Sequence, residues 1–243
     1  MLIHGRWAYL PAEGCLGGQG LPQQKDVSFR QRLIKRGILR AMDAQRKAWE
    51  REYAKPDPLW KGPPQEGGDL PSGQRVLELG CGNGKTLSAL TRLDNEVVGL
   101  DHSINALQSC LESSSAHLVQ GDVRSLPFRE ASFDTVLMLH LLEHLVEADR
   151  LKAVREARRV LRPGGHVLVR VFSVRDMRFG KGIEVEKNTF QRGNGILYHY
   201  FEAAELSSLF GDLSEEYLTE ALSTKRYGGK ERLRAELVAA FGR

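Results

Sequence analysis

The segment VLELGCGNGKT, residues 76–86, constrains the fold of this 243-residue chain more than any other. An apolar strand pattern runs into Gly80, Gly82 and Gly84, and a helical pattern follows. Glycines at alternate positions let the backbone take positive φ angles and approach a ligand closely. The segment predicts a strand, a tight turn and a helix with a ligand on bare backbone, although a plain strand-to-helix connection would use the same glycines.

Four more apolar segments follow along the chain, with helical patterns between them. They read EVVGL (96–100), HLVQ (117–120), FDTVLML (133–139) and HVLVRVF (166–172). Strands and helices that alternate in this way form a parallel sheet covered on both faces. We therefore expect an α/β fold in residues 72–243, Rossmann-like and doubly wound.

Acidic residues stand at the ends of the next two predicted strands. Asp101 lies 21 residues beyond Gly80, where a carboxylate can accept hydrogen bonds from ribose hydroxyls. Asp122 follows the strand at 117–120 and can accept from an adenine amino group, with the Val123 amide facing the ring. Each residue could instead be a helix cap or a turn residue. Their succession after the glycine turn favours a nucleoside-containing cofactor.

The turn itself suits a ligand that carries both a negatively and a positively charged group. The N-terminus of the following helix favours an anionic group such as a carboxylate, while Glu78 suits a cationic amino or sulfonium group. Cys81 adds only a small side chain to the turn. The spacing Gly80-x-Gly82-x-Gly84 departs from G-x-G-x-x-G, so a nicotinamide-dependent enzyme is the lesser hypothesis.

Residues 72–172 resemble the class I S-adenosylmethionine-dependent methyltransferases of the type 11 group. The resemblance rests on VLELGCGNGKT, VVGLDHS, GDVRSLPF, SFDTVLMLHLLEHL and EARRVLRPGGHVLV, which follow in the family's order. It implies a mostly parallel seven-stranded sheet with one antiparallel strand near the C-terminus, and S-adenosylmethionine as the cofactor with S-adenosylhomocysteine as the product. The cofactor contacts that it implies are Glu78, Gly80, Cys81, Gly82, Asn83, Gly84, Asp101, His102, Asp122, Val123 and His140.

A second resemblance covers KNTFQRGNGILYHYFEAAELSSLF, residues 187–210. The order F-x-R-G-N-G-x-x-Y-x-Y-F is similar to that of tRNA methyltransferases that form 3-methylcytidine. Tyr198, His199 and Tyr200 follow a glycine-rich loop that can close over a substrate, so we predict that they contact it. Packing in the core is the alternative for these three side chains.

His140 is the candidate catalytic residue. It follows the strand at 133–139, where an acceptor would meet the cofactor, and a histidine there can act as a general base or simply line the site. A sulfonium methyl donor is already activated, so alignment of the acceptor should dominate catalysis. His140 and His144 are four residues apart but lack an evident third ligand, so we expect no metal.

Residues 1–71 form the predicted N-terminal extension. We expect a loose tail at 1–24 and, at 25–71, a basic helical segment followed by a linker rich in Pro and Gly. Apolar residues recur near helical spacing between residues 27 and 53, with Lys and Arg in the gaps. The apolar stripe can pack on the domain, or the basic face can meet RNA or a membrane surface.

The composition leaves the methyl acceptor open. A net charge of +4 and a pI near 9.0 permit RNA, as does a basic C-terminal tail with Lys225, Arg226, Lys230, Arg232 and Arg234. An RNA-binding enzyme should present these charges and those at 30–47 beside the cofactor mouth.

The compact size equally fits a small metabolite or a protein side chain as acceptor. A catalytically inactive cofactor-binding scaffold is a further alternative. The three scattered cysteines and the lack of a long apolar run predict a cytoplasmic protein without membrane contact, and no obligate protein partner is evident.

Overall fold

The computed structural model describes residues 7–8, 44–55, 70 and 72–243. Most of the predicted tail at 1–24 and of the extension at 25–71 therefore lies outside the described residues, and these boundaries stay predictions. The described part of the extension includes a helix at 44–53 and the short strand β1 (Trp7–Ala8). None of the described helices has both the length and the apolar character that crossing a membrane requires.

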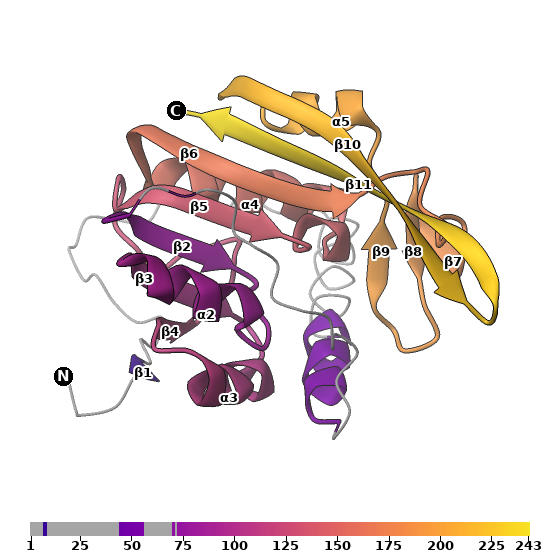
Figure 1. Cartoon of the computed structure of the whole chain (residues 1–243), viewed down its shortest axis with the longest axis horizontal. Helices are drawn as coiled ribbons and strands as arrows, with labels where there is room; N and C mark the ends of the chain where they lie inside the picture. Colours follow the sequence, from indigo (N-terminus) through magenta and orange to yellow (C-terminus); the bar gives the residue numbers. More distant parts are fainter. Residues whose placement is uncertain (1–6, 9–43, 56–69, 71) are drawn as a thin grey trace, which may run out of the picture.

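An eight-stranded sheet runs through the centre of the molecule in the order β1-β4-β3-β2-β5-β6-β11-β10 (Figure 1). Its other strands are β2 (Arg75–Leu79), β3 (Glu96–Asp101), β4 (His117–Gln120), β5 (Phe133–Leu139), β6 (Leu161–Phe172), β10 (Ser214–Tyr227) and β11 (Lys230–Gly242). Neighbours from β1 to β6 are parallel, and β11 is antiparallel to both β6 and β10. Apart from the edge strand β1, this is the mostly parallel seven-stranded sheet that the sequence predicted.

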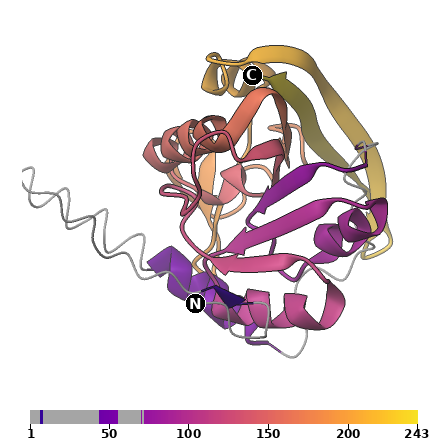
Figure 2. The same cartoon turned by 90° about the vertical axis from the view of Figure 1, so that its left-hand side faces the viewer.

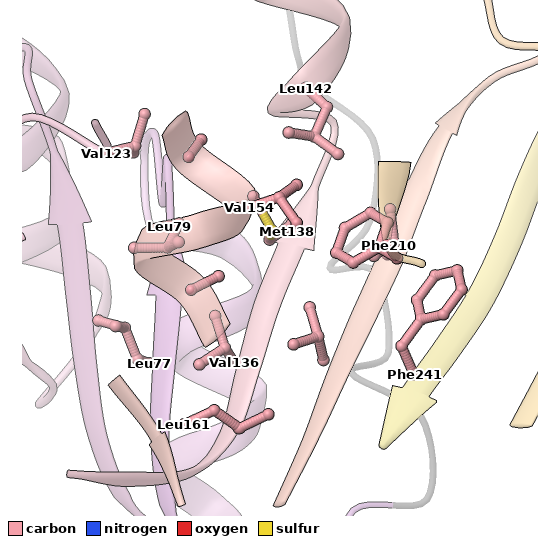
Figure 3. Close-up of a cluster of buried hydrophobic side chains, with 14 of the residues drawn as sticks. Leu77, Leu79, Val123, Val136, Met138, Leu142, Val154, Leu161, Phe210 and Phe241 are labelled. Carbon is pink, nitrogen blue, oxygen red and sulfur yellow. The ribbon is translucent and has the colours of Figure 1, made fainter. Parts of the chain in front are cut away.

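Helices cover both faces of this sheet (Figure 2). Those on one face are α2 (Lys85–Leu90), the 3-10 helix η1 (Thr91–Leu93) and α3 (Ile104–Ser113), whereas α4 (Glu147–Val160) covers the other. Side chains alternate along β2: Val76 packs in the cluster of α2 and α3, and Leu77 in the cluster of α4. The α4 cluster extends to Phe210 and Phe241, whose rings stack 4.4 Å apart (Figure 3). Two buried faces establish the doubly wound arrangement.

A small antiparallel sheet stands beside the carboxyl end of β6 (Figure 1). It consists of β7 (Ile183–Glu186), β8 (Thr189–Gln191) and β9 (Leu197–His199), and a bridge between Ser173 and Phe201 joins this region to the end of β6. The predicted glycine-rich loop is the turn between β8 and β9, where Gly195 has a φ of 84°. The chain then forms α5 (Ala203–Leu209) and enters β10.

The predicted basic tail is wrong, because residues 225–234 belong to a β-hairpin of β10 and β11. Its register pairs Arg226 with Glu231 and Tyr227 with Lys230. Gly228 and Gly229 connect the strands with φ angles of 55° and 77°. Two consecutive residues with positive φ form the turn that matches the twist of paired strands, so this glycine pair is a hairpin signal.

Candidate active site

A cavity of about 710 Å³ lies at the carboxyl ends of the parallel strands. Six of the predicted cofactor residues line it: Gly80 after β2, Asp101 and His102 at the end of β3, Asp122 and Val123 after β4, and His140 after β5. Doubly wound folds bind their ligands at this edge of the sheet, because loops from successive strands converge there. The other predicted cofactor residues lie behind this lining, in β2 and the glycine turn: Glu78, Cys81, Gly82, Asn83 and Gly84.

The glycine turn has the backbone that its sequence predicts. Gly80, Gly82 and Gly84 have φ angles of 73°, 53° and 77°. The backbone N–H groups of Gly80 and Cys81 donate to the carbonyl of Leu100 at 2.7 and 3.1 Å, so the turn is fixed to β3. A Cβ on Gly80 would lie 2.9 Å from the Leu141 Cδ1, so a larger residue would require that side chain to shift.

Asp101 holds this turn from the side of β3. Its carboxylate is buried and accepts hydrogen bonds from the backbone N–H of Gly82 at 2.9 Å and of Ser103 at 2.8 Å. Each carboxylate oxygen has a second acceptor position. Asp101 can therefore order the turn and still receive a hydroxyl donor from a ligand.

Glu78 is a buried carboxyl group beneath the turn. Burial raises its pKa to about 8, the charge of Asp101 acts in the same direction, and a hydrogen bond from Thr86 opposes both. Within the described structure, Glu78 Oε2 and His102 Nε2 are buried without a hydrogen-bond partner. An unpaired buried polar atom costs about 1–3 kcal/mol, so a ligand with polar groups facing these atoms would fit here.

Asp122 forms an ion pair that the sequence did not predict. The Arg124 Nε donates to Asp122 Oδ1 at 2.8 Å, and Arg124 Nη1 donates to Asp149 Oδ2 at 2.8 Å. Burial opposes ionisation of Asp122, but hydrogen bonds and charge from Arg124 outweigh it and lower the pKa of this carboxyl. Arg124 also lines the cavity, and its place two residues after Asp122 is the signal that could have identified it.

His140 lies between two carboxylates at the end of β5. Its Nδ1 is 2.7 Å from Glu143 Oε1, and its Nε2 is 3.8 Å from Glu236 Oε1. Glu143 is fully buried in the 3-10 helix η2 (Leu142–His144), and the His140 ring packs 4.8 Å from that of Phe172. The His140 ring is thus oriented by Glu143 on its Nδ1 side, and its Nε2 side is directed toward Glu236.

The helix at 44–53 forms one wall of the cavity and bridges the two sides of the site. At its N-terminal end, Gln45 donates to the carbonyl of Gly195 at 2.6 Å and accepts from the N–H of Leu197 at 3.2 Å. One turn later, Glu50 accepts from the N–H of Ile104 at 2.8 Å, at the start of α3. The helix thus joins the β8–β9 turn to the end of β3.

Two aromatic residues of this helix face the cavity. The Tyr53 hydroxyl lies 2.5 Å from the point where a Cβ on Gly82 would be, and burial, with charges including that of Asp101, raises the pKa of Tyr53 well above its ordinary value. The Trp49 ring stacks on Tyr53 at 5.8 Å and meets His144 edge-on at 4.7 Å. The sequence placed Trp49 in a packing stripe only. Its four-residue spacing from Tyr53 was the missed signal, because such residues share a helix face.

The structure does not bring His199 and Tyr200 into the cavity. Both are buried, and His199 interacts with Thr189 Oγ1 at 2.8 Å and with Glu205 Oε1 at 2.9 Å. His199 thus faces Glu205 of α5, whereas Tyr200, the residue after β9, packs with Phe172 and Phe190. Tyr198 is half-buried against His144 without lining the cavity. From the same hairpin, Gln191 and Leu197 line the cavity instead.

Residues 77–169 match a family model described as a methyltransferase domain. The chain is 30% identical over 152 residues to the human tRNA N(3)-cytidine methyltransferase METTL2B, a match that covers 56% of this chain and 40% of that protein. It is 34% identical over 128 residues to the mouse tRNA (carboxymethyluridine(34)-5-O)-methyltransferase ALKBH8, covering 52% of this chain and 18% of that protein. The chain thus spans less than half the length of these curated relatives.

A solved structure shares the fold. A SAM-dependent methyltransferase from Methanosarcina mazei matches with a TM-score of 0.61 and 22% identity, over 71% of this chain and 94% of that one. A second, from Anabaena variabilis, matches with a TM-score of 0.60 and 16% identity, over 82% of this chain and 93% of that one.

Proposed function

We propose that this chain, whose residues 77–169 match a methyltransferase-domain model, is an S-adenosylmethionine-dependent enzyme that methylates RNA. The match of residues 77–169 to a methyltransferase-domain model supports the enzyme class, and with it the cofactor, that the sequence predicted, and the solved structures share the fold. The observation that carries the cofactor part of the proposal is the convergence of residues from four consecutive strand ends on one cavity. A nucleoside and an amino-acid moiety could each be recognised there.

The described residues fit this cofactor. Bound S-adenosylmethionine would supply a methyl group that its sulfonium already activates. The buried Glu78 carboxyl suits the amino group of the methionine part, while Asp101 can receive the ribose hydroxyls. Asp122 and Val123 line the cavity and would recognise the adenine ring, with Arg124 fixing the Asp122 carboxylate.

His140 is our candidate for proton removal from the acceptor. Its Nδ1 interacts with Glu143, so Nε2 is the nitrogen that would take the proton. Glu236 would then face the resulting imidazolium. A methylated nitrogen or oxygen that loses a proton needs such a base, and a positioned base typically contributes about 10²–10⁴ in rate.

The choice of RNA as acceptor rests on the relatives and on charge. METTL2B and ALKBH8 are both named as tRNA methyltransferases. The predicted basic face at 30–47 lies outside the described residues except at its end, where Arg46 lines the cavity. Arg234 forms ion pairs with Asp176 and Glu236, so we remove it from the predicted RNA surface.

A cytoplasmic location is part of the proposal. Cys81 and Cys110 are buried and form no disulfide, and the Cys110 thiol donates to the Gly82 carbonyl at 3.0 Å. Thiols beside a cofactor turn suit a reducing compartment, where disulfides are rare.

Transfer of a labelled methyl group tests the proposal. The protein is incubated with S-adenosylmethionine labelled in the methyl group and, separately, with total tRNA, a small-molecule extract and a protein extract. We expect label in tRNA, and digestion to nucleosides followed by mass spectrometry identifies the modified atom. Label only in the small-molecule or protein fraction would replace RNA by that acceptor. Calorimetry should show binding of S-adenosylhomocysteine and none of NAD.

A further inference from the structure

The β10–β11 hairpin continues beyond the sheet as a two-stranded ribbon (Figure 1). β11 pairs with β6 only from Glu236 onward, where Glu236 lies opposite Phe172. Residues 223–233, here called the distal ribbon, pair across the hairpin and with no third strand in the part of the chain that the structure describes. A backbone bond from Met177 to Leu233 supports the base of this ribbon.

The distal ribbon concentrates positive charge. Its cations are Lys225, Arg226, Lys230 and Arg232, all exposed, and its one acidic residue is Glu231. The register sets Lys225 directly opposite Arg232, and like charges in such a pair are destabilising. Nothing in the folding of the hairpin requires that pair, so a partner with negative charge would explain it.

These cations differ from the arginines at the base of the hairpin. Arg234 is bound to Asp176 at 2.7 Å, and Arg175 is bound to Glu220 at 2.6 Å. Among the described residues, by contrast, Lys225, Lys230 and Arg232 face no carboxylate across the hairpin, and only Arg226 does, opposite Glu231. The base of the hairpin is internally neutralised, whereas the distal ribbon keeps an excess of positive charge.

The distal ribbon is continuous with a part of β11 that contacts the candidate active site. Glu236, the first β11 residue paired with β6, lies 3.8 Å from His140. Arg232 lies four residues before Glu236 in β11. At about 3.4 Å per residue, this places it roughly 14 Å from Glu236 along the strand. A polymer with one reacting unit at His140 could therefore reach the ribbon with units outside the cavity.

We propose that the distal ribbon binds phosphate groups of the RNA acceptor that flank the methylated nucleotide. This inference rests on the proposed RNA acceptor. Lysine and arginine bind phosphates without reading sequence, so such contacts would position the RNA and add affinity. A membrane surface is less suited as the partner. β11 connects the ribbon to Glu236 beside His140, so an RNA with one nucleotide in the cavity would pass this part of β11.

The salt dependence of RNA binding tests the ribbon. The probe is total tRNA, titrated with the full-length protein between 50 and 200 mM salt. Each phosphate contact contributes about −0.7 to the slope of log affinity against log salt for single strands. The slope of the double variant Arg226→Gln/Arg232→Gln should therefore be less steep by about 1.4. Between 50 and 200 mM salt its affinity for tRNA should then decrease about sevenfold less than that of the wild type.

A matched control removes the same charge elsewhere. Arg92 and Arg129 are also exposed and form no ion pair with a described residue, but they lie near the amino ends of the strands. Arg92→Gln/Arg129→Gln should keep the wild-type slope. Unchanged S-adenosylhomocysteine binding in both variants would show that the fold is retained.

The outcomes separate the ribbon from the proposed acceptor. If the wild type methylates tRNA but the wild type and the ribbon variant show equal slopes of log affinity against log salt, the ribbon inference alone is overturned. A wild-type protein that binds and methylates no tRNA would overturn both. Ribbon-dependent binding to vesicles of anionic lipid, without a change in the tRNA slope, would assign the ribbon to membranes and contradict the inference.

Discussion

The Asp101 carboxylate accepts a 2.9 Å hydrogen bond from the backbone N–H of Gly82, and this contact ties the end of β3 to the glycine turn after β2. Asp101→Ala should therefore loosen the turn and remove an acceptor for the ribose. We expect S-adenosylhomocysteine binding to weaken by about 1–3 kcal/mol, measured by calorimetry. Asp94→Asn, at an exposed position with a φ of 56° that Asn tolerates, is the control. Wild-type affinity for Asp101→Ala would contradict the cofactor assignment.

This part of the site could be predicted from sequence because it is built at strand ends. Each cofactor residue follows an apolar strand that is recognisable in the chain, and parallel strands bring their carboxyl ends to one edge. Gly80, Asp101, Asp122 and His140 meet at the cavity for this reason. The apolar pattern marked the five parallel strands from β2 to β6, whereas the seven-stranded sheet with an antiparallel strand was implied by the family resemblance.

The remainder of the site depends on contacts that no local pattern encodes. The helix at 44–53 reaches the cavity through Gln45 and Glu50, whose partners are 54 to 152 residues away along the chain. The ribbon was read as a tail because its charges masked the alternation of its strands. His199 and Tyr200 were assigned to substrate from their place after a glycine loop, but both are buried, His199 against Glu205 and Tyr200 against Phe172 and Phe190.

Glu78 predicts a dependence of stability on pH. Its pKa is raised from 4.5 to about 8 in the folded protein, so the folded state holds this proton when the unfolded chain has lost it. The contribution of Glu78 to the free energy of unfolding is greatest below pH 4.5. It decreases as the pH rises to 8, by on the order of 5 kcal/mol in all. Ligand-free Glu78→Gln should lack this decline in denaturant unfolding measured from pH 5 to 8. If the free energy of unfolding depends on pH in the same way in both proteins, Glu78 is not the buried acid that causes the decline.

The same carboxyl predicts that cofactor binding tightens as the pH rises. An ammonium group binds the ionised form of Glu78, so binding near neutral pH must release its proton. Calorimetry of S-adenosylhomocysteine should show affinity increasing by up to about tenfold per pH unit between pH 6 and 8, and proton release in buffers of different ionisation enthalpy. Glu78→Gln should remove both effects. Persistence of proton release in that variant would assign it to another group.

His140 should affect turnover more than cofactor binding. His140→Asn keeps a residue that tolerates the φ of 54° at this position, while removing the imidazole. We expect kcat for methyl transfer to fall by about 10²–10⁴ with unchanged affinity for S-adenosylhomocysteine. His166→Asn, in an exposed pair with Glu216, serves as the control. A raised KM with normal kcat would instead make His140 a lining residue.

A side chain at residue 82 would clash with Tyr53, and the effect of this clash can be separated from that of backbone strain. A Cβ on Gly82 would lie 2.5 Å from the Tyr53 hydroxyl, and the φ of 53° disfavours any other residue. Gly82→Ala should therefore displace either the turn or the helix at 44–53, and weaken S-adenosylhomocysteine binding at least about tenfold, or 1.4 kcal/mol. Gly73→Ala is the matched control: its φ is 75° and its Cβ would have no neighbour within 4 Å. That variant should lose about 1 kcal/mol of stability and keep its affinity.

Removing the hydroxyl then identifies the cause. In Gly82→Ala/Tyr53→Phe the nearest remaining ring atom, the former hydroxyl-bearing carbon, would lie 3.4 Å from the new Cβ, and that separation is an ordinary contact. Affinity should recover partly, because the strain at residue 82 remains while the clash is gone. Tyr53→Phe alone measures what the hydroxyl contributes to binding. If Gly82→Ala binds S-adenosylhomocysteine as the wild type does, the glycine turn does not hold the cofactor; if the double variant recovers nothing, the helix at 44–53 is not pressed against the turn.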